Sequence, residues 1–311
     1  MPEKHYSEWQ TNYSPDERTV PEERFVVRTD ELLLKHLPDK SIPWQAGLPP
    51  LWARGFTPRT LFDLGCGIGG FTRAVLTRLG EWGCLRHLEQ VVLVERDTTL
   101  FSGGADALHS HLTETVAAVL ASFGKDNARI HVLLENMEIT TSGRSHASGF
   151  IPILEPWRGN SDLIIASHIT YYFGDGSGHG LIDLLRRYYL STGGLIWCVI
   201  RKQCCPIYLA RADVLRELGK QDPKPFDYAE HFESSVLPTL PEVILTDKSD
   251  QEFLIGKKRG EYEEAAYYLM WREAPAGNWS TPHAKAVMGL SNQPEPLFCE
   301  RHFIIGKEHA K

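Results

Sequence analysis

Residues 61–70 read Leu-Phe-Asp-Leu-Gly-Cys-Gly-Ile-Gly-Gly, and this stretch decides the fold. Its first half is an apolar run typical of a buried strand, and its second half is a turn rich in glycine. Gly65, Gly67 and Gly69 have no Cβ to obstruct a ligand lying on the backbone, and glycine adopts positive φ where such a turn needs it. Residues 71–79 then show a helical pattern and would offer unpaired N–H groups at their start. A strand, a glycine turn and a helix in this order predict a binding site for a nucleotide-like ligand.

Three further apolar runs end in polar residues, as expected of parallel strands that meet a ligand at their carboxyl edge. A carboxylate at such a position can accept hydrogen bonds from ribose hydroxyls. The runs are residues 91–94, followed by Glu95; residues 130–134, followed by Glu135 and Asn136; and residues 161–167, followed by His168.

Strand and helix patterns alternate from residue 61 to residue 201, which predicts an α/β fold. We expect a Rossmann-like, doubly wound, mostly parallel sheet with helices on both faces, plus N-terminal and C-terminal helical lid elements. All four strand-end motifs then meet at the edge where the strand order reverses. The expected strands are 60–64, 91–95, 130–135, 162–166 and 194–201, and the expected helices are 70–80, 104–122 and 178–191.

A chain of 311 residues with 42% hydrophobic residues can bury a substantial core, and we expect a single domain, residues 1–311. Helical and aromatic patterns outside the core are interpreted as elements that cover the strand ends. The expected parts are an N-terminal lid or substrate region at 1–50, a ligand-binding core at 58–201, a substrate-covering insertion at 205–276 and a final strand at 294–307.

Charge and composition narrow the class of protein. The net charge of -7 argues against a nucleic acid as the main partner, since binding one usually needs a basic surface. No apolar run approaches the roughly 18 residues of a membrane span, and the first ten residues are charged and polar rather than apolar. We expect a cytoplasmic protein, monomeric or homodimeric, that contacts neither nucleic acid nor membrane.

No metal site is predicted. The six cysteines are dispersed and lack the spacing of metal ligands. His109 and His111 lie off the apolar stripe of the helix expected at 104–122, so both are expected to be exposed to solvent.

Residues 63–69 resemble the first motif of the class I S-adenosylmethionine-dependent methyltransferases. A dinucleotide dehydrogenase is the competing interpretation, but its fingerprint is Gly-x-Gly-x-x-Gly. Here the glycines occupy every second position, and Asp63 stands two residues before the first. Asp63 would repel a pyrophosphate, whereas the sulfonium and the amino group of S-adenosylmethionine are cationic. The resemblance implies that S-adenosyl-L-methionine is the cofactor.

Within that family the chain looks most like the histamine N-methyltransferase type of small-molecule methyltransferase. The resemblance rests on the wide gap between Gly69 and Glu95, on His168 with the Tyr171-Tyr172 pair after the fourth strand, and on an aromatic helix before the last strand. It implies a methyltransferase acting on a small-molecule acceptor, with a place in secondary metabolism.

The strand ends supply the candidate residues for the methyl donor. Asp63 and the turn would hold its amino acid part, Glu95 its ribose, and Asn136 its adenine amino group, with Met137 packed on the adenine face. Asp63 could instead cap the following helix, Glu95 could be an exposed loop acid, and Glu135 could replace Asn136. The full set is Asp63, Gly65, Cys66, Gly67, Gly69, Glu95, Asn136, Met137 and Ser167.

The catalytic candidates His168, Tyr171 and Tyr172 follow the fourth strand. Aromatic faces stabilise a cationic sulfonium or ammonium, although these rings could instead pack in the core and His168 could be structural. A general base would be needed for an amine acceptor, and Glu23, Glu135, His168 and His302 remain unranked for that role. The candidate acceptor-binding residues are Tyr6, Trp9, Tyr13, Tyr268 and Trp271.

Three functions stay open at this point. The first is methyl transfer to an amine nitrogen of an aromatic metabolite. The second is methylation of a carbon in an electron-rich ring or alkene of a natural-product precursor, which the same aromatic residues would serve. The third is a non-catalytic module that binds S-adenosylmethionine.

Overall fold

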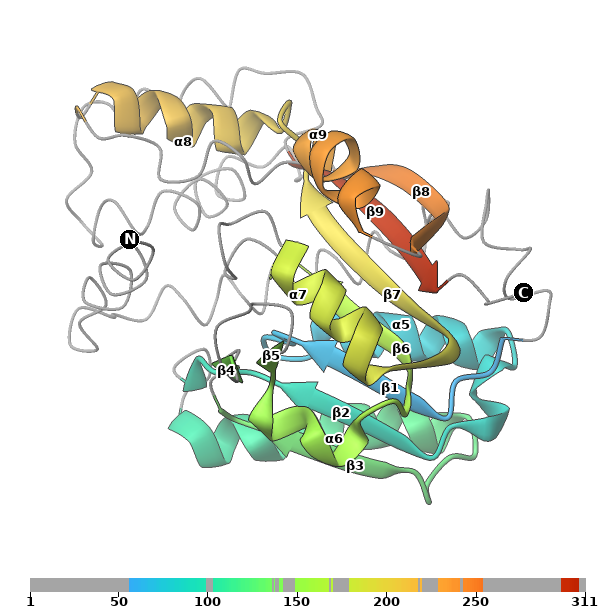
Figure 1. Ribbon diagram of the computed structural model, residues 1–311. Helices are drawn as coiled ribbons and strands as arrows, with labels where there is room; N and C mark the ends of the chain where they lie inside the picture. The colour runs from blue at the N-terminus through green and yellow to red at the C-terminus, as the bar shows by residue number, and fades with distance from the viewer. Residues whose placement is uncertain are drawn as a thin grey trace.

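The computed structural model describes residues 56–98, 103–135, 137, 140–141, 149–167, 169, 179–217, 219, 229–240, 243–253 and 298–307. The described part contains a seven-stranded sheet in the order β3-β2-β1-β6-β7-β9-β8, together with a small two-stranded sheet of β4 and β5 (Figure 1). The strands are β1 (Thr60–Leu64), β2 (Gln90–Val94), β3 (Arg129–Leu133), β4 (Thr140–Thr141), β5 (Gly149–Phe150), β6 (Ser161–Ser167), β7 (Leu190–Arg201), β8 (Val243–Phe253) and β9 (Phe298–Lys307).

The strand order reverses between β1 and β6. From β1 the chain passes outward through β2 to β3 and then returns to the other side of β1 with β6 and β7. The neighbours β3, β2, β1, β6 and β7 all pair in parallel, and β9 runs antiparallel between β7 and β8. Ligands of doubly wound sheets bind outside the carboxyl ends of the strands at such a switch point. The predicted Rossmann-like, mostly parallel sheet is confirmed.

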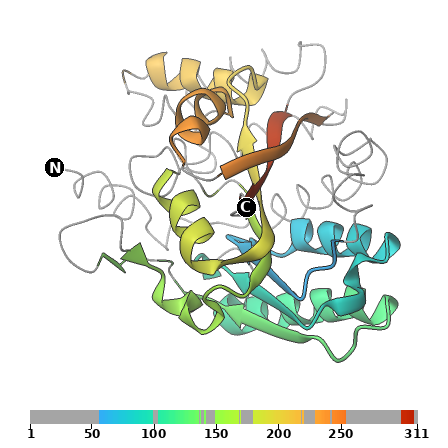
Figure 2. The ribbon, with the colours of Figure 1, turned by 45° about the vertical axis from the view of Figure 1, so that its right-hand side comes forward.

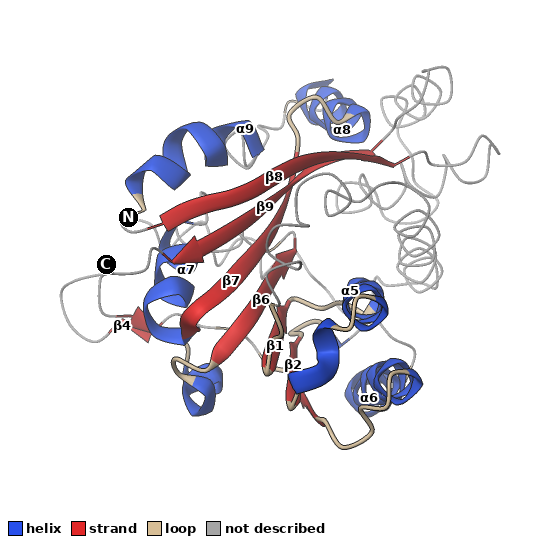
Figure 3. Cartoon of the chain, turned by 90° about the vertical axis from the view of Figure 1, so that its right-hand side faces the viewer, coloured by secondary structure: helices blue, strands red, loops and turns tan. Residues whose placement is uncertain are grey.

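Helices cover both faces of the sheet (Figure 3). One face carries α5 (Gly70–Glu81) and α6 (Gly104–Ser122). The other carries α7 (His179–Leu184), which continues into β7 through a π-helical turn, Leu185–Tyr189. A further helix, α8 (Pro206–Glu217), lies beyond the carboxyl end of β7 and away from β2 and β3 (Figures 1 and 2). The described helices therefore cover both faces of the sheet, as the alternation of strand and helix patterns in the sequence predicts.

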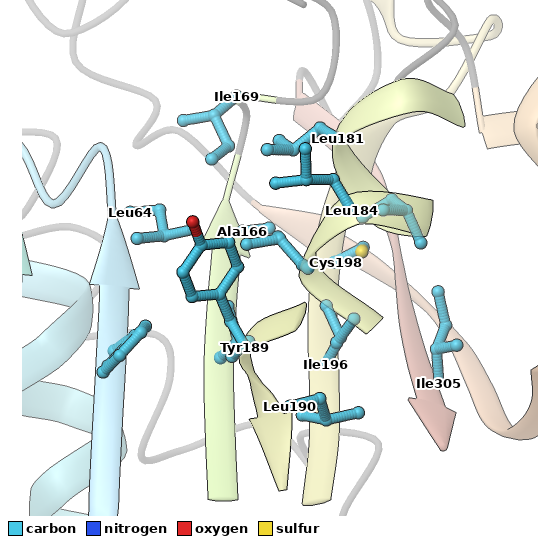
Figure 4. Close-up of a cluster of buried hydrophobic side chains, with 14 of the residues drawn as sticks. Leu64, Ala166, Ile169, Leu181, Leu184, Tyr189, Leu190, Ile196, Cys198 and Ile305 are labelled. Atoms are coloured by element: carbon cyan, nitrogen blue, oxygen red, sulfur yellow. The ribbon is translucent and has the colours of Figure 1, made fainter. Parts of the chain in front are cut away.

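Successive residues of each strand pack into two separate hydrophobic clusters, because side chains of a strand alternate between the faces of a sheet. Leu61 packs into the cluster under α5 and α6. Phe62 and Leu64 pack into the cluster under α7, where Leu64 lies near Ala166 and Tyr189 (Figure 4). Asp63 is two residues after Leu61 on β1, so its side chain points to the same face of the sheet, towards α5.

The predicted element bounds agree well with the structure where apolar periodicity is strong. The helix expected at 104–122 coincides with α6, and the late strand expected at 294–307 is β9, Phe298–Lys307. The strand β8, within the insertion expected at 205–276, was not predicted. Its sequence, VILTDKSDQEF, is apolar in its first three residues and polar over most of the rest. This suits an edge strand, and among the described strands β8 pairs with β9 alone.

A network of charged side chains ties β8 and β9 to their neighbours. Arg301 on β9 binds Asp250 on β8 through two hydrogen bonds of 2.5 and 3.1 Å and Glu233 through one of 2.7 Å. Lys202, just after β7, donates to the same Asp250 carboxylate at 2.6 Å. Glu233 lies in the π-helical turn Phe232–Val236 that follows α9 (Ala229–His231). Hydrogen bonds from Arg301 and Lys202 lower the pKa of Asp250 to about 2.

Replacing Asp250 by Asn should lower the free energy of unfolding at pH 7 by about 1 kcal/mol, a value that allows for the partial exposure of the pair. A carboxylate with a depressed pKa stabilises the fold above its unfolded pKa of about 3.9 and loses that contribution as the pH falls towards 2. Urea titrations at several pH values should therefore show the stabilities of the two proteins converging as the pH falls from about 4 to about 2.

Asp213→Asn is the matched control, because Asp213 pairs with Arg216 in an exposed i,i+3 bridge of 2.8 Å on α8. It should change stability by less than about 0.5 kcal/mol. Equal effects of the two variants at pH 7 would contradict a stabilising network at Asp250.

None of the described helices is both long and apolar enough to cross a lipid bilayer.

Candidate functional site

The glycine turn between β1 and α5 has a backbone that favours glycine at three positions. The φ angles of Gly65, Gly67 and Gly69 are 72°, 57° and 83°. This left-handed conformation costs other residues roughly 1–2 kcal/mol, because their Cβ approaches the backbone. Gly69 is the N-cap of α5 and provides no side-chain cap.

The three glycines differ in what surrounds them. A Cβ on Gly65 would lie 2.3 Å from Cγ2 of Ile169, and one on Gly69 would lie 2.9 Å from Cδ2 of Leu112 on α6. Among the described residues, a Cβ on Gly67 would meet nothing within 4 Å. Packing inside the protein therefore accounts for Gly65 and Gly69, whereas Gly67 borders open space where a ligand could lie against the backbone.

The amide hydrogens of the turn are largely committed to the protein itself. Gly65 and Cys66 both donate to the carbonyl of Val94 at the end of β2, at 2.7 and 3.0 Å, and Gly69 donates to Cys66 at 2.9 Å. Gly67 donates to Oε2 of Glu95 at 2.8 Å. Since every carbonyl oxygen has two lone pairs, the turn keeps the capacity to accept hydrogen bonds. It is suited to a ligand that donates hydrogen bonds rather than to a pyrophosphate that accepts them.

Asp63 lies one residue before the end of β1 and is 1% exposed. Its Oδ2 accepts a hydrogen bond of 2.5 Å from the hydroxyl of Thr72, in the first turn of α5. This short bond joins the strand and the helix on either side of the turn. Asp63 therefore binds a side chain of α5 and is not its N-cap, which is Gly69.

Thr72→Val should destabilise the fold by about 2 kcal/mol, because it removes the hydroxyl that donates to a buried carboxylate and keeps the shape of the side chain. Thr72→Ser retains the hydroxyl and should cost less than about 1 kcal/mol. Both values can be read from denaturant unfolding. A Val variant as stable as the Ser variant would show that the Asp63–Thr72 bond contributes little.

Glu95 follows β2 and is 8% exposed, so the alternative of an exposed loop acid is wrong. Its Oε1 accepts hydrogen bonds from the backbone N–H groups of Arg96 and Asp97, at 2.9 and 2.8 Å. Its Oε2 accepts the bond from Gly67. Burial raises the pKa of the carboxyl, and the three N–H donors oppose that rise. The carboxylate thus joins the end of β2 to the glycine turn.

The other candidates for the donor lie around this edge or outside the described residues. Met137 is half-buried against the cluster under α7, and Ser167 is the half-buried last residue of β6. Asn136 lies outside the described residues, and Glu135 is exposed. The catalytic and acceptor-binding candidates also lie outside them, namely His168, Tyr171, Tyr172, Tyr6, Trp9, Tyr13, Tyr268 and Trp271.

Two contacts at the glycine turn were not predicted, those of Thr72 and His111, and the prediction that His111 is exposed is wrong. His109 is exposed as expected, but His111 is half-buried, and its Nε2 lies 3.2 Å from the carbonyl oxygen of Ile68. Thr72 was also missed. Its position three residues after Gly69 places it on the first turn of α5 beneath Asp63, a signal that could have found it. His111 precedes Leu112 on α6, but nothing in the sequence shows that this part of α6 touches the turn.

A buried chain of hydrogen bonds joins β7 and β9 on the same face of the sheet as α5. Trp197 Nε1 donates to His302 Nδ1 at 3.1 Å, and His302 Nε2 lies 2.9 Å from Oε1 of Glu300. Because an indole N–H only donates, Nδ1 of His302 must accept, and Nε2 faces the carboxylate. Both ring nitrogens of His302 are occupied within the protein, which argues against it as a general base. Phe71 of α5 packs edge-on against Trp197, with ring centroids 5.2 Å apart.

The described residues contain no group of three or more His, Cys, Asp or Glu side chains that could hold a metal ion.

No protein family model and no curated protein matches the chain. Solved structures resemble it distantly. The [4+2]-cyclase SpnF is 16% identical over 84% of this chain and 80% of its own, with a TM-score of 0.42. A SAM-dependent methyltransferase from Geobacter sulfurreducens, in complex with S-adenosyl-L-homocysteine, is 14% identical over 84% of this chain and 90% of its own, with a TM-score of 0.43. One from Methanosarcina mazei is 14% identical over 84% of this chain and 99% of its own, with a TM-score of 0.44. Likenesses at this level assign no activity.

Proposed function

We propose that the carboxyl ends of β1 and β2 bind S-adenosyl-L-methionine, and that the chain is a methyltransferase acting on a small molecule. The observation that supports the proposal best is the hydrogen-bonding character of the glycine turn. Four of its amide hydrogens are committed internally, and it lies between two buried carboxylates, Asp63 and Glu95. A site rich in acceptors and negative charge suits a ligand with ribose hydroxyls, an amino group and a sulfonium.

The chain's own residues fit the parts of this donor. The open space beside Gly67 admits a ligand against the turn, whose carbonyl oxygens would accept hydrogen bonds from the amino group. Glu95 would accept from a ribose hydroxyl. Met137 would pack on the adenine, with Asn136 near the adenine amino group. A pyrophosphate would meet the same two carboxylates and be repelled, so the acidic site disfavours a dinucleotide.

S-Adenosylmethionine supplies an electrophilic methyl group, and an in-line displacement demands mainly alignment and a dry site from the protein. We assign the acceptor side to His168, Tyr171 and Tyr172, which follow β6, because β6 lies beside β1 across the switch point. Their aromatic faces would stabilise positive charge on the donor and the acceptor. Tyr6, Trp9, Tyr13, Tyr268 and Trp271 would line the acceptor site.

We further propose that the acceptor is an amine nitrogen of an aromatic metabolite, as in the histamine N-methyltransferase type. The alternative is a carbon of an electron-rich ring or alkene. A carbon acceptor needs no base before attack, whereas an ammonium must first lose a proton. The logarithm of the rate of an amine methyltransferase should therefore rise with pH below the pKa of the bound amine.

Incubation with S-adenosylmethionine labelled in the methyl group tests the proposal. We would offer aromatic amines, phenols and electron-rich arenes as separate acceptor sets and follow label transfer. The expected result is transfer to the amine set, and transfer to the arenes alone would replace nitrogen by carbon. Calorimetry should detect binding of S-adenosylhomocysteine and no binding of NAD. Donor binding without transfer to any acceptor would favour a non-catalytic binding module, and binding of NAD alone would overturn the proposal.

A further inference from the structure

The carboxylate of Glu95 is engaged before any donor arrives. Its two oxygens accept three backbone hydrogen bonds, from Gly67 at 2.8 Å, Arg96 at 2.9 Å and Asp97 at 2.8 Å. Two of these donors belong to the segment that follows Glu95 itself. The third, Gly67, lies 28 residues earlier, at the middle of the glycine turn.

The bond to Gly67 restrains the part of the turn that packing leaves free. Gly65 is confined by Ile169, and Gly69 by Leu112. Around Gly67 a Cβ would meet nothing within 4 Å among the described residues, so no side chain packs against it there, although the thiol of Cys66 donates a long bond of 3.7 Å to its carbonyl oxygen. Glycine has the greatest conformational freedom to lose on ordering. The 2.8 Å hydrogen bond to Glu95 is therefore the shorter of the two side-chain hydrogen bonds that reach Gly67 from the described residues, and it restrains the conformation with φ of 57°.

We propose that Glu95 is a positioning residue that pre-forms the donor site by fixing Gly67, in addition to any contact it makes with the ribose. This inference rests on the proposed function. A carboxylate offers about four acceptor sites, and three are in use here. The remaining site, on Oε2, can accept one ribose hydroxyl, so both roles can operate at once. A turn that is already ordered costs the donor less entropy on binding.

Two variants remove the bond to Gly67 in different ways. Glu95→Gln keeps the length of the side chain but leaves only one oxygen, because the other becomes an NH₂ group that donates. When the oxygen accepts from Arg96 and Asp97, which keeps two of the three bonds, the NH₂ group faces Gly67 and cannot accept from its N–H. Glu95→Asp keeps the charge and is shorter by one methylene, so it can still accept from the N–H groups that follow it and no longer reaches the turn. Both should free Gly67, and Glu95→Asp should do so with its negative charge intact.

Binding of S-adenosylhomocysteine and of its 2′,3′-dideoxy analogue separates the two roles. The analogue has no ribose hydroxyls, so a residue that only contacts the ribose does not affect its affinity. We expect both variants to weaken the analogue at least about fivefold, as measured by displacement of labelled S-adenosylhomocysteine. An analogue affinity within about twofold of wild type in both variants would overturn the positioning role. Failure of the wild-type protein to bind S-adenosylhomocysteine would instead count against the proposed donor.

Amide hydrogen exchange in the free protein tests the same inference without a ligand. Exchange at Gly67 should accelerate by about tenfold or more in both variants, whereas exchange at Gly65, whose N–H donates to Val94, should change far less. A melting temperature would not show whether Gly67 alone is freed. A general loss of stability would accelerate exchange at Gly65 and Gly67 together, whereas loss of the bond to Glu95 should accelerate exchange mainly at Gly67. Unchanged exchange at Gly67 would contradict the inference even if the variants bind the donor poorly.

Discussion

Gly67→Ala is expected to weaken the binding of S-adenosylhomocysteine by about 10- to 100-fold, the equivalent of about 1.4–2.8 kcal/mol. The added methyl group would project into the open space beside the turn, which the donor is proposed to fill. The fold itself should lose only about 1 kcal/mol, for the left-handed conformation at φ of 57°. Calorimetry gives the affinity, and urea unfolding gives the stability.

Gly83→Ala is a closely matched control for this substitution. Gly83 also has a left-handed φ, 69°, and a Cβ there would likewise meet nothing within 4 Å in the part of the chain that the structure describes. It follows the carboxyl end of α5, at the edge of the sheet opposite the turn. The control should lose similar stability and keep wild-type affinity. Equal affinities of the two variants would mean that no ligand lies on Gly67.

Gly65→Ala is expected to destabilise the fold by about 3 kcal/mol, which combines the left-handed strain with a steric clash. Its Cβ would lie 2.3 Å from Cγ2 of Ile169, well inside any permitted contact. Ile169 follows β6, is 6% exposed and lies next to Leu64 and Ala166 (Figure 4). The clash therefore forces apart the two strands that flank the switch point.

The double variant Gly65→Ala/Ile169→Ala isolates the clash from the backbone strain. Ile169→Ala alone should cost about 2–4 kcal/mol through the cavity it leaves. The new methyl group partly fills that cavity, so the double variant should be at least about 1 kcal/mol more stable than the sum of the single losses implies. Strict additivity, measured by denaturant unfolding, would contradict a close approach of Gly65 and Ile169.

The central part of the fold follows from local sequence patterns. Apolar runs that end at Leu64, Val94 and Leu134 predict parallel strands, because both faces of such strands are covered by helices. Glycine at positions 65, 67 and 69 predicts the left-handed turn, and each has positive φ. The strand β8 was not predicted, because its second half is polar and its partner strand β9 lies 45 or more positions later in the chain.

The sequence predicts the glycine turn and the two acids of the candidate site, but it does not predict most of the hydrogen-bond partners of these residues. Asp63 and Glu95 stand at the ends of β1 and β2 as their sequence context indicates. The partners of these carboxylates depend on how segments far apart in the chain meet. No pattern around Gly67 reveals that it donates to Glu95, and the sequence of α6 does not show that His111 reaches Ile68. Only the contact between Thr72 and Asp63 had a signal, in the position of Thr72 on the first turn of the helix.

A crystal structure with bound S-adenosylhomocysteine tests the central claim most directly. We predict that its ribose lies within hydrogen-bonding distance of Oε2 of Glu95, about 3 Å, and that its amino group faces the carbonyl oxygens of the turn beside Gly67. Gly67 should retain its positive φ and its bond to Glu95 in the complex. A ligand bound elsewhere, or a turn whose open side is closed by protein side chains in the complex, would contradict the account.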